Sequence, residues 1–316
     1  MNKRIAGVLA VALSLSGLAC ADDRTTTLVV NMSAGGPLDV AARVVAEKLR
    51  ASLGQTIVVD NKVGASGNIG ASYVTKASAD GQTVLITTDA PVAINPLIFP
   101  SIPFKTEDLK AVALIGSVPS AISVNAKSGM GSLADLVKKG EQAPVTFSSS
   151  GSGSPAHIGS AMLAQSAGMQ VNHIPYKGGG PAALALAAGE VDAGVLAIPG
   201  IQAFVKDGRI KPLAVTSARR LSQFPDVPTT AELGYPDIQT DLLFLAMVPS
   251  RTPDAAVQKL QAAFAAALSD PSVKEKLSGL GIESNGPSNP AAAASALESL
   301  RTRYAKIVKQ AGIKVE

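Results

Sequence analysis

Four times in this chain a short β-rich run ends in a loop of small residues that opens a helix. The loops read "SAGGPLD" at 33–39, "GASGNIG" at 64–70, "GSGSPAH" at 151–157 and "KGGGPAA" at 177–183. A recurrence of strand, loop and helix predicts parallel sheets whose faces are covered by helices. In such sheets these loops follow the carboxyl ends of the strands, which is where ligands generally bind. The sequence therefore predicts an α/β fold with glycine loops gathered around a cleft.

The chemistry of these loops favours a small anion as the ligand. Glycine lets the backbone approach a ligand closely, and the first turn of a helix offers unpaired N–H groups at the positive end of its dipole. Pro37, Pro155 and Pro181 are expected at the first helical position. A single Gly-Pro turn before a helix is common in connecting loops and does not by itself indicate a binding site. Four such loops, poor in charge and rich in small polar residues, together indicate a binding cleft.

Composition excludes several other classes of protein. The chain has 316 residues, of which 47% are hydrophobic and 16% are charged, so it is globular and long enough for two domains. Its formal net charge is only +4, aromatic residues make up 3%, and no run of five basic residues occurs. A nucleic-acid-binding protein usually shows a basic stripe and stacking rings. We therefore expect no nucleic-acid partner.

The first residues predict export from the cytoplasm. Lys3 and Arg4 precede the apolar stretch "IAGVLAVALSLSGLA", and small residues at 19 and 21 match a signal-peptidase site. Residues 1–21 are thus a predicted signal peptide, cleaved after Ala21, and the mature protein is expected to be soluble in the periplasm. Lipidation of Cys20 is the alternative. Cys20 is the only cysteine, so the cleaved product would carry neither disulfide nor thiol.

Motifs for nucleotide binding and catalysis are incomplete. The segment "GSGSPA" at 151–156 imitates a dinucleotide-binding fingerprint, but no acidic residue ends a second strand about twenty residues later. Neither a phosphate-binding P-loop nor a Gly-x-Ser-x-Gly nucleophile motif occurs. His157 lies near Ser150, Ser152 and Ser154, which keeps an exported serine hydrolase as an alternative. With two histidines and no mature cysteine, we expect no metal, no cofactor and no catalytic residues.

Individual polar residues carry weaker predictions. Asp39 follows "GGPL" in the first helical turn, where a carboxylate favours the dipole, so we interpret it as a cap. Asn68 either caps its helix or faces the ligand, and Asp192 either orients a cleft loop or caps a turn. His173 is expected to be structural. For His157, ligand contact and helix packing both stay open.

Longer blocks of the sequence resemble one family. Residues 35–88, "HIPYKGGGPAALALAAGEVDAGV", "FPDVPTTAELGYPD" and "VPSRTPDAAVQKL" are similar, in this order, to the Bug-type extracytoplasmic receptors of tripartite tricarboxylate transporters. The resemblance implies a type II periplasmic-binding-protein fold, in which two α/β lobes are joined by two crossing strands around a central cleft. The crossings would fall near Ser120 and Asp241. Residues 22–120 with 242–316 would form lobe 1, and residues 121–241 would form lobe 2.

The resemblance also implies a ligand site and a function. The implied contacts come from loops of both lobes: Ala34, Gly35, Gly36, Asn68, Thr87, Thr88, Ser149, Gly153, Ser154, His157 and Asp192. The first loop begins "NMSAGG", whereas relatives usually carry an aromatic-proline lead-in, so the pocket entrance differs here. The expected protein is a monomeric receptor, not an enzyme. It would bind a small mono-, di- or tricarboxylate by lobe closure and deliver it to integral-membrane transporter subunits. A receptor for another transporter or for a sensor system stays an alternative.

Overall fold

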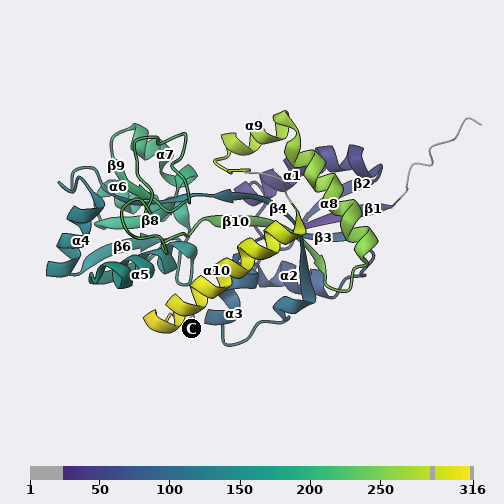
Figure 1. Ribbon diagram of the computed structural model, residues 1–316, viewed down its shortest axis with the longest axis horizontal. Coiled ribbons are helices and arrows are strands. Elements are labelled where there is room, and N and C mark those ends of the chain that lie inside the picture. The colour runs from purple at the N-terminus through teal and green to yellow at the C-terminus, as the bar shows by residue number, and fades with distance from the viewer. Residues whose placement is uncertain (1–23, 285–288, 314–316) are drawn as a thin grey trace, which may run out of the picture.

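The computed structural model describes residues 24–284 and 289–313, and Figure 1 shows two lobes side by side. The predicted signal peptide, residues 1–21, lies outside the described residues. None of the described helices is long and apolar enough to cross a membrane. Each lobe is built on one five-stranded sheet. The expected two-lobed α/β fold is confirmed.

The first sheet combines parallel strands from the N-terminal part with one strand from much later in the chain. Its spatial order is β2 (Thr56–Asn61), β1 (Thr25–Val30), β3 (Thr83–Thr88), β10 (Leu242–Pro249) and β4 (Leu109–Val118). Strand β1 pairs in parallel with β2 and β3, whereas β10 is antiparallel to β3 and β4. The late strand β10 therefore connects the end of the chain to the first lobe.

The helices of the first lobe cover both faces of this sheet. Along β1, Leu28 and Val30 pack into a core with α1 and α8, while Val29 faces a second core, as the two-residue period of a strand requires. The helices and helical turns of this lobe are α1 (Pro37–Leu53), η1 (Ala65–Gly67), α2 (Asn68–Thr75), η2 (Ala90–Ile94), α3 (Asn95–Ile98), η3 (Thr106–Asp108), α8 (Asp254–Ser269), α9 (Pro271–Gly279) and α10 (Pro290–Ala311).

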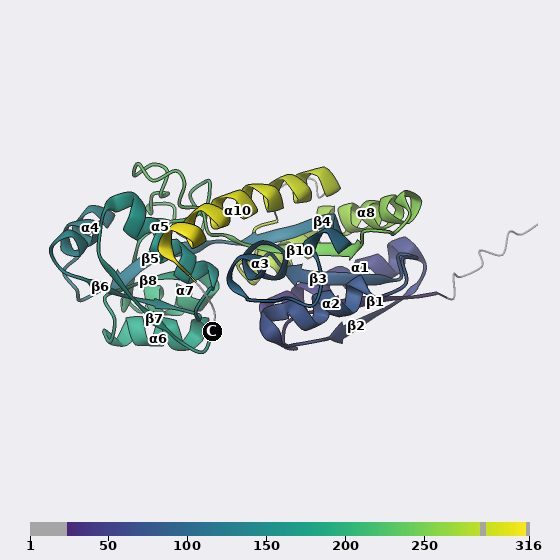
Figure 2. The same cartoon turned by 90° about the horizontal axis from the view of Figure 1, so that it is seen from below.

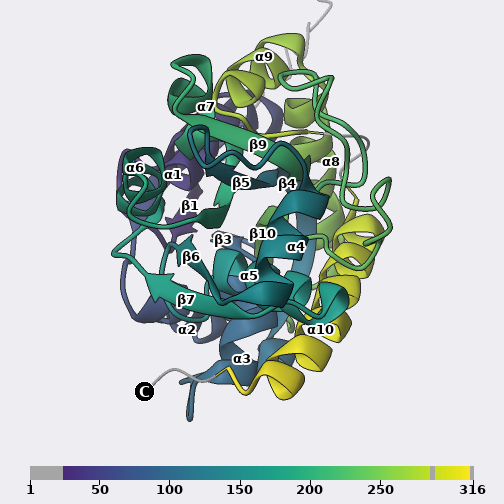
Figure 3. The same cartoon turned by 90° about the vertical axis from the view of Figure 1, so that its left-hand side faces the viewer.

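The second sheet repeats this plan. Its spatial order is β7 (Val171–Pro175), β6 (Val145–Ser149), β8 (Ala193–Ala197), β5 (Ser120–Asn125) and β9 (Ile210–Val215). Strand β6 is parallel to β7 and β8, and β5 is antiparallel to β8 and β9. Four helices pack around it: α4 (Leu133–Gln142), α5 (Pro155–Ala167), α6 (Gly179–Ala188) and α7 (Ile198–Lys206). Figure 3 looks onto this lobe.

The chain crosses between the sheets twice, and a helix also spans them. Pro119 alone separates β4 from β5, and residues 216–241 lead from β9 to β10. Helix α10 packs on β4 of the first lobe and on α5 of the second, and Figure 2 shows it lying along both. The buried side chains of α10 belong to one hydrophobic core that includes Val29 and Leu85 of the first lobe and Phe147 and Ile158 of the second. The exact division into residues 22–120 with 242–316 and 121–241 stays a prediction.

Three details of the sequence-based prediction were wrong. Pro37 and Pro155 are the first residues of their helices, but α6 already begins at Gly179, so Pro181 is its third residue. Helix α7 was not predicted. The apolar spacing in 254–269 and 290–312 predicts two helices after β10, whereas the structure also has α9 between them. Both missed helices are nine residues long, too short to show a clear helical period.

Candidate functional site

The loop after β1 leaves its backbone accessible. Gly35 has a φ of +78°, and Ala34 and Gly35 are exposed while Gly36 is partly buried. Asp39 in the first turn of α1 holds the loop in place. Its carboxylate accepts hydrogen bonds from Gly35 N at 2.9 Å and from Arg43 Nε at 2.9 Å. Asp39 is only 2% exposed. Asp39 was interpreted as a cap of its helix. It does bond a backbone N–H near the start of α1, but that N–H belongs to Gly35, which precedes the N-cap residue Gly36.

The electrostatics of Asp39 follow from these bonds. The Arg43 guanidinium, which also donates from Nη2 at 3.0 Å, is the main cause that lowers the pKa of Asp39 to about 2. Asn61 Nδ2 adds a further hydrogen bond at 2.9 Å. Asp39 is thus ionised at neutral pH, and its charge is paired with the half-exposed Arg43 guanidinium, so little of that charge is left to repel an anion.

Asn31 is a buried residue at the same site that sequence reasoning missed. It follows β1, is 1% exposed, and donates through Nδ2 to Thr87 Oγ1 at 2.7 Å and to Gly67 O at 3.4 Å. Its Oδ1 is buried with no hydrogen-bond partner within the described part of the chain. Asn31 therefore joins the ends of β1 and β3 to the second glycine loop. Its place directly after a predicted strand was the available signal.

Two predicted ligand contacts, Thr87 and Thr88, are the last residues of β3, next to the loop that follows β1. Both are buried, and the Thr87 hydroxyl accepts from Asn31 and donates to Thr88 O at 2.8 Å. These bonds use the hydroxyl of Thr87 inside the protein. The structure brings the two threonines to the predicted edge of the sheet, where they support the loops.

The second glycine loop is tightly packed against Asn31. Gly67 has a φ of +89°, and a Cβ there would lie 2.4 Å from Asn31 Nδ2. Gly67 is also the residue that precedes α2, so the idea that Asn68 caps this helix was wrong. Asn68 is 2% exposed, and its Oδ1 accepts from Asn95 Nδ2 at 2.8 Å. Its predicted ligand contact stays a prediction.

The third loop, residues 149–154, is held by hydrogen bonds within itself and to two histidines. Ser149 Oγ is bonded to the backbone of Gly151 and lies 2.6 Å from His173 Nε2. Gly153 N donates to His157 Nδ1 at 3.1 Å, and Ser154 caps α5 by accepting from His157 N at 3.2 Å. The structure therefore brings Ser149, Gly153, Ser154 and His157 together.

Asp192 lies away from this loop. It precedes β8, and Ala193 pairs with Val124 while Ala197 pairs with Ser120 at the crossing, so Asp192 is at the outer end of the second sheet. Its carboxylate accepts from Thr146 N at 2.9 Å and from Lys139 Nζ at 2.6 Å. Of the two roles considered, fixing a turn agrees with this geometry. The expected convergence of Asp192 with the glycine loops is contradicted, because the residue starts its strand and the loops follow theirs.

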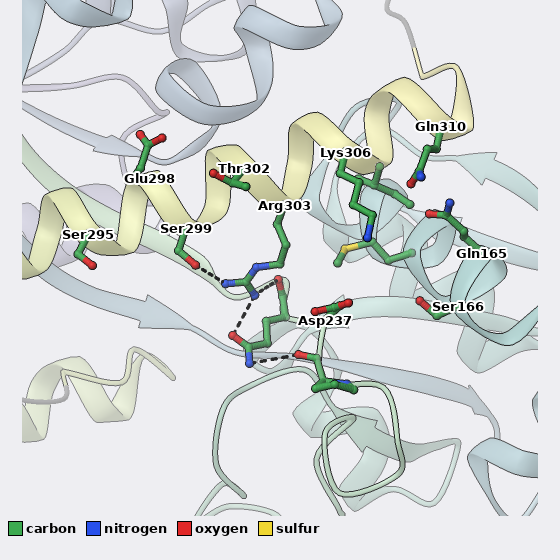
Figure 4. A pocket seen from close by; sticks show the side chains of 14 residues that line it. Gln165, Ser166, Asp237, Ser295, Glu298, Ser299, Thr302, Arg303, Lys306 and Gln310 are labelled. Atoms are coloured by element: carbon green, nitrogen blue, oxygen red, sulfur yellow. Dashed lines mark hydrogen bonds between the residues drawn. The ribbon is translucent and has the colours of Figure 1, made fainter.

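Two cavities lie along α10. One of about 810 Å³ is lined by α5, residues 236–239 and α10, and Figure 4 shows its side chains. Arg303 on α10 donates from Nη1 to Gln239 Oε1 at 2.9 Å, and Lys306 lies one turn further on. A second cavity of about 400 Å³ is lined by His157, His173 and the last turn of α10. Both lie between the lobes, where a relative motion would alter them.

Comparisons with known proteins agree with this architecture. Residues 41–313 match the family described as the tripartite tricarboxylate transporter family receptor. Protein BugT of Bordetella pertussis is 38% identical over 259 residues, covering 79% of this chain and 79% of that protein.

Two solved structures from Rhodopseudomonas palustris extend the similarity to the fold. Rpa4515 with adipate is 35% identical, has a TM-score of 0.78, and covers 92% of this chain and 98% of its own. MatC with bound malate is 27% identical, has a TM-score of 0.74, and covers 90% of this chain and 99% of its own. With a family match across both lobes and these relatives over most of its length, the chain belongs to the tripartite tricarboxylate transporter receptor family.

Proposed function

We propose that this protein is a periplasmic receptor that binds a small carboxylate between its lobes and delivers it to a tripartite tricarboxylate-type membrane transporter. The observation that carries the proposal is the set of glycine loops after β1, β6 and β7 and before α2, which combine accessible backbone with few free charges. Amides at helix starts suit carboxylate oxygens. Adipate and malate, the molecules named with the two R. palustris structures, are both dicarboxylates.

The proposed contact residues fall into two groups, those that still offer a donor to a ligand and those whose polar groups are already hydrogen-bonded inside the protein. Ala34, Gly35 and Gly36 present accessible backbone, and the Ser154 hydroxyl, which accepts from His157 N, keeps its own proton to donate. Asn68, Thr87, Thr88 and Ser149 are buried and hydrogen-bonded, so in this conformation they position the loops. Delivery to membrane subunits rests on the family alone.

A thermal-shift screen tests the ligand class. Adipate, malate, a monocarboxylate, a tricarboxylate and a neutral sugar are compared at equal ionic strength. Specific binding raises the melting temperature with RT ln(1 + [L]/Kd), so a dicarboxylate should give a concentration-dependent shift. A shift from the sugar, and from none of the acids, would overturn the proposal. Ser154→Ala should reduce the shift, and Ser152→Ala, on the same loop, is the matched control.

One observation bears on the alternative of a serine hydrolase. Ser149 and His173 lie at 2.6 Å, the spacing of a nucleophile and its base. However, Ser149 is buried, and burial together with the charge of His157 lowers the pKa of His173 to about 4, which makes it a weak base at neutral pH. No carboxylate among the described residues is hydrogen-bonded to His173. Ester turnover that disappears in Ser149→Ala would restore the hydrolase interpretation.

A further inference from the structure

We propose that His157 and His173 are positioning residues, which as a neutral stacked pair hold residues 149–154 in the shape that receives a ligand carboxylate. The proposal rests on the function proposed above for this loop. The two residues are the only histidines of the chain, and they come from different elements, α5 and β7. Their rings lie face to face, with centroids 3.6 Å apart and planes 4° from parallel.

Each ring holds a different part of the loop. Gly153 N donates to His157 Nδ1 at 3.1 Å, so Nδ1 must carry a lone pair and the proton of the neutral ring is on Nε2. On the other side, His173 Nε2 lies 2.6 Å from Ser149 Oγ, which in turn bonds the backbone of Gly151. The stacked pair therefore links both ends of the loop through side chains that are themselves packed together.

The surroundings favour the neutral state of both rings. Burial lowers the pKa of His157, and burial with the charge of its neighbour lowers the pKa of His173 to about 4. The cavity beside the rings is lined from α5 by Ser160 and Gln165, from β7 by Val171, and from α10 by Ile307 and Gln310. None of these is titratable, so on the side of this cavity the two rings face no acid or base.

Protonation would break the arrangement. A proton on His157 Nδ1 would point at Gly153 N–H, so two donors would face each other where the neutral ring accepts a hydrogen bond. A charge on both rings would add repulsion at 3.6 Å. Ligand affinity should therefore fall as the pH falls through the pKa of the pair. A pair that acted as a cationic counterion for the ligand would show the opposite trend.

The experiment compares adipate binding by calorimetry at pH 7.5 and pH 4 in the wild-type protein and two variants. His157→Asn keeps an oxygen that can accept from Gly153 N but does not titrate. Because it loses the stacked ring, it should bind more weakly than wild type at pH 7.5, but it should lose less of its own affinity at pH 4. His157→Phe keeps a ring to stack but leaves Gly153 N–H without its partner, and should weaken binding at pH 7.5 roughly tenfold or more.

The Asn variant also controls for titration of the ligand itself, since adipate titrates equally with both proteins. The proposal is overturned if wild type binds more tightly at pH 4 than at pH 7.5, or if wild type and His157→Asn show the same pH dependence between these values. Thermal melts confirm that each variant is folded.

Nuclear magnetic resonance of the free protein separates this inference from the proposed function. With only two histidines, the ring signals can be assigned by substituting one of them. Both should titrate below their ordinary pKa, and the Gly153 amide signal should move with the titration of His157. If neither adipate nor any other acid of the thermal-shift screen binds, the proposed function fails, while the linked Gly153 titration still supports the histidine pair. The inference about the histidine pair is overturned if the two rings titrate at their ordinary pKa, or if the Gly153 amide signal does not change as His157 titrates.

Discussion

At the scale of single residues, the proposed site in the first lobe depends on two glycines, Gly35 and Gly67, which have different surroundings. Gly35 and Gly67 both have positive φ, at +78° and +89°, so both sites disfavour a side chain through the backbone alone. They differ in their surroundings. A Cβ at Gly35 would meet nothing within 4 Å, whereas one at Gly67 would meet Asn31 Nδ2 at 2.4 Å and Pro91 Cγ at 2.9 Å.

We therefore expect Gly67→Ala to destabilise the protein more than Gly35→Ala. The shared conformational cost is about 1 kcal/mol, and crowding at Gly67 should add roughly 1–3 kcal/mol because Asn31 cannot move without losing Thr87. Urea unfolding of both variants measures the difference. Equal losses of stability would mean that the loop at Gly67 yields more easily than its contacts indicate.

Two buried aspartates should affect stability with opposite dependence on pH. Asp89 is buried beside Tyr304, and burial raises its pKa to about 7. Between about pH 4 and pH 7 the folded protein keeps this proton while the unfolded chain loses it, so the contribution of Asp89 to stability falls as the pH rises. Asp39, with its pKa lowered to about 2, contributes stability that is present above about pH 4 and is lost as the pH falls toward 2.

The prediction for Asp89→Asn is a gain relative to wild type that grows from pH 4 to pH 8, on the order of 2 kcal/mol. The amide oxygen can still accept from Leu243 N, which donates to Asp89 Oδ1 at 3.1 Å. Asp39→Asn, the matched control, should instead lose on the order of 2 kcal/mol at pH 7 and less at pH 3. Urea titrations across pH measure both. A gain for Asp89→Asn that does not change with pH would refute the titration argument.

Residue roles could be predicted from the sequence only where they depend on neighbours along the chain. Asp39 fixes a loop four residues away and Ser132 caps α4, and both follow from local spacing. The contact of Asn31 with Thr87 joins residues 56 positions apart and exists because β1 lies beside β3. Asp192 was misplaced for the same reason, since the end of the sheet at which it lies depends on strand order and direction.

At the scale of elements, the strands and most helices were predictable, including the short α2 and α4, whereas α7, α9 and η2 were not. The strand at 83–88 is buried from Val84 onward, and α1 ends at Gly54 in the left-handed conformation, as its sequence indicates. Helix α7 has nine residues, including Pro199 and Gly200, and η2 is a turn of π-helix containing Pro91. Such segments form because the surrounding core fixes them, which local propensity does not show.

Helix α5 offers a test of packing against propensity. Gly159 lies on the face toward β8, where a Cβ would meet Val195 Cγ1 at 2.9 Å and Thr240 Cγ2 at 3.1 Å. Gly159→Ala should therefore destabilise by roughly 1–3 kcal/mol, although alanine favours a helix. Gly200→Ala in α7, where nothing lies within 4 Å, should stabilise by about 0.5–1 kcal/mol. Thermal unfolding measures both, and a stabilising Gly159→Ala would show that α5 can shift away from β8.

At the scale of the whole molecule, the two lobes are linked by the crossing at Pro119, the segment 216–241 and helix α10. The glycine loops are spread over both lobes and supply few free charges, so neither lobe alone offers a strong anion site. A ligand held by loops of both lobes binds the closed arrangement more tightly than the open one, and shifts the population toward it.

We therefore expect dicarboxylate binding to make the molecule more compact. Small-angle X-ray scattering should show a smaller radius of gyration with saturating adipate than without it, and no change with a sugar at equal concentration. The Ser154→Ala variant should need more adipate to reach the same compact state, because it loses a donor on the second lobe while the hinge is unaltered. An adipate-dependent melting shift with an unchanged radius would mean that one lobe binds the ligand alone, and would exclude closure as the mechanism.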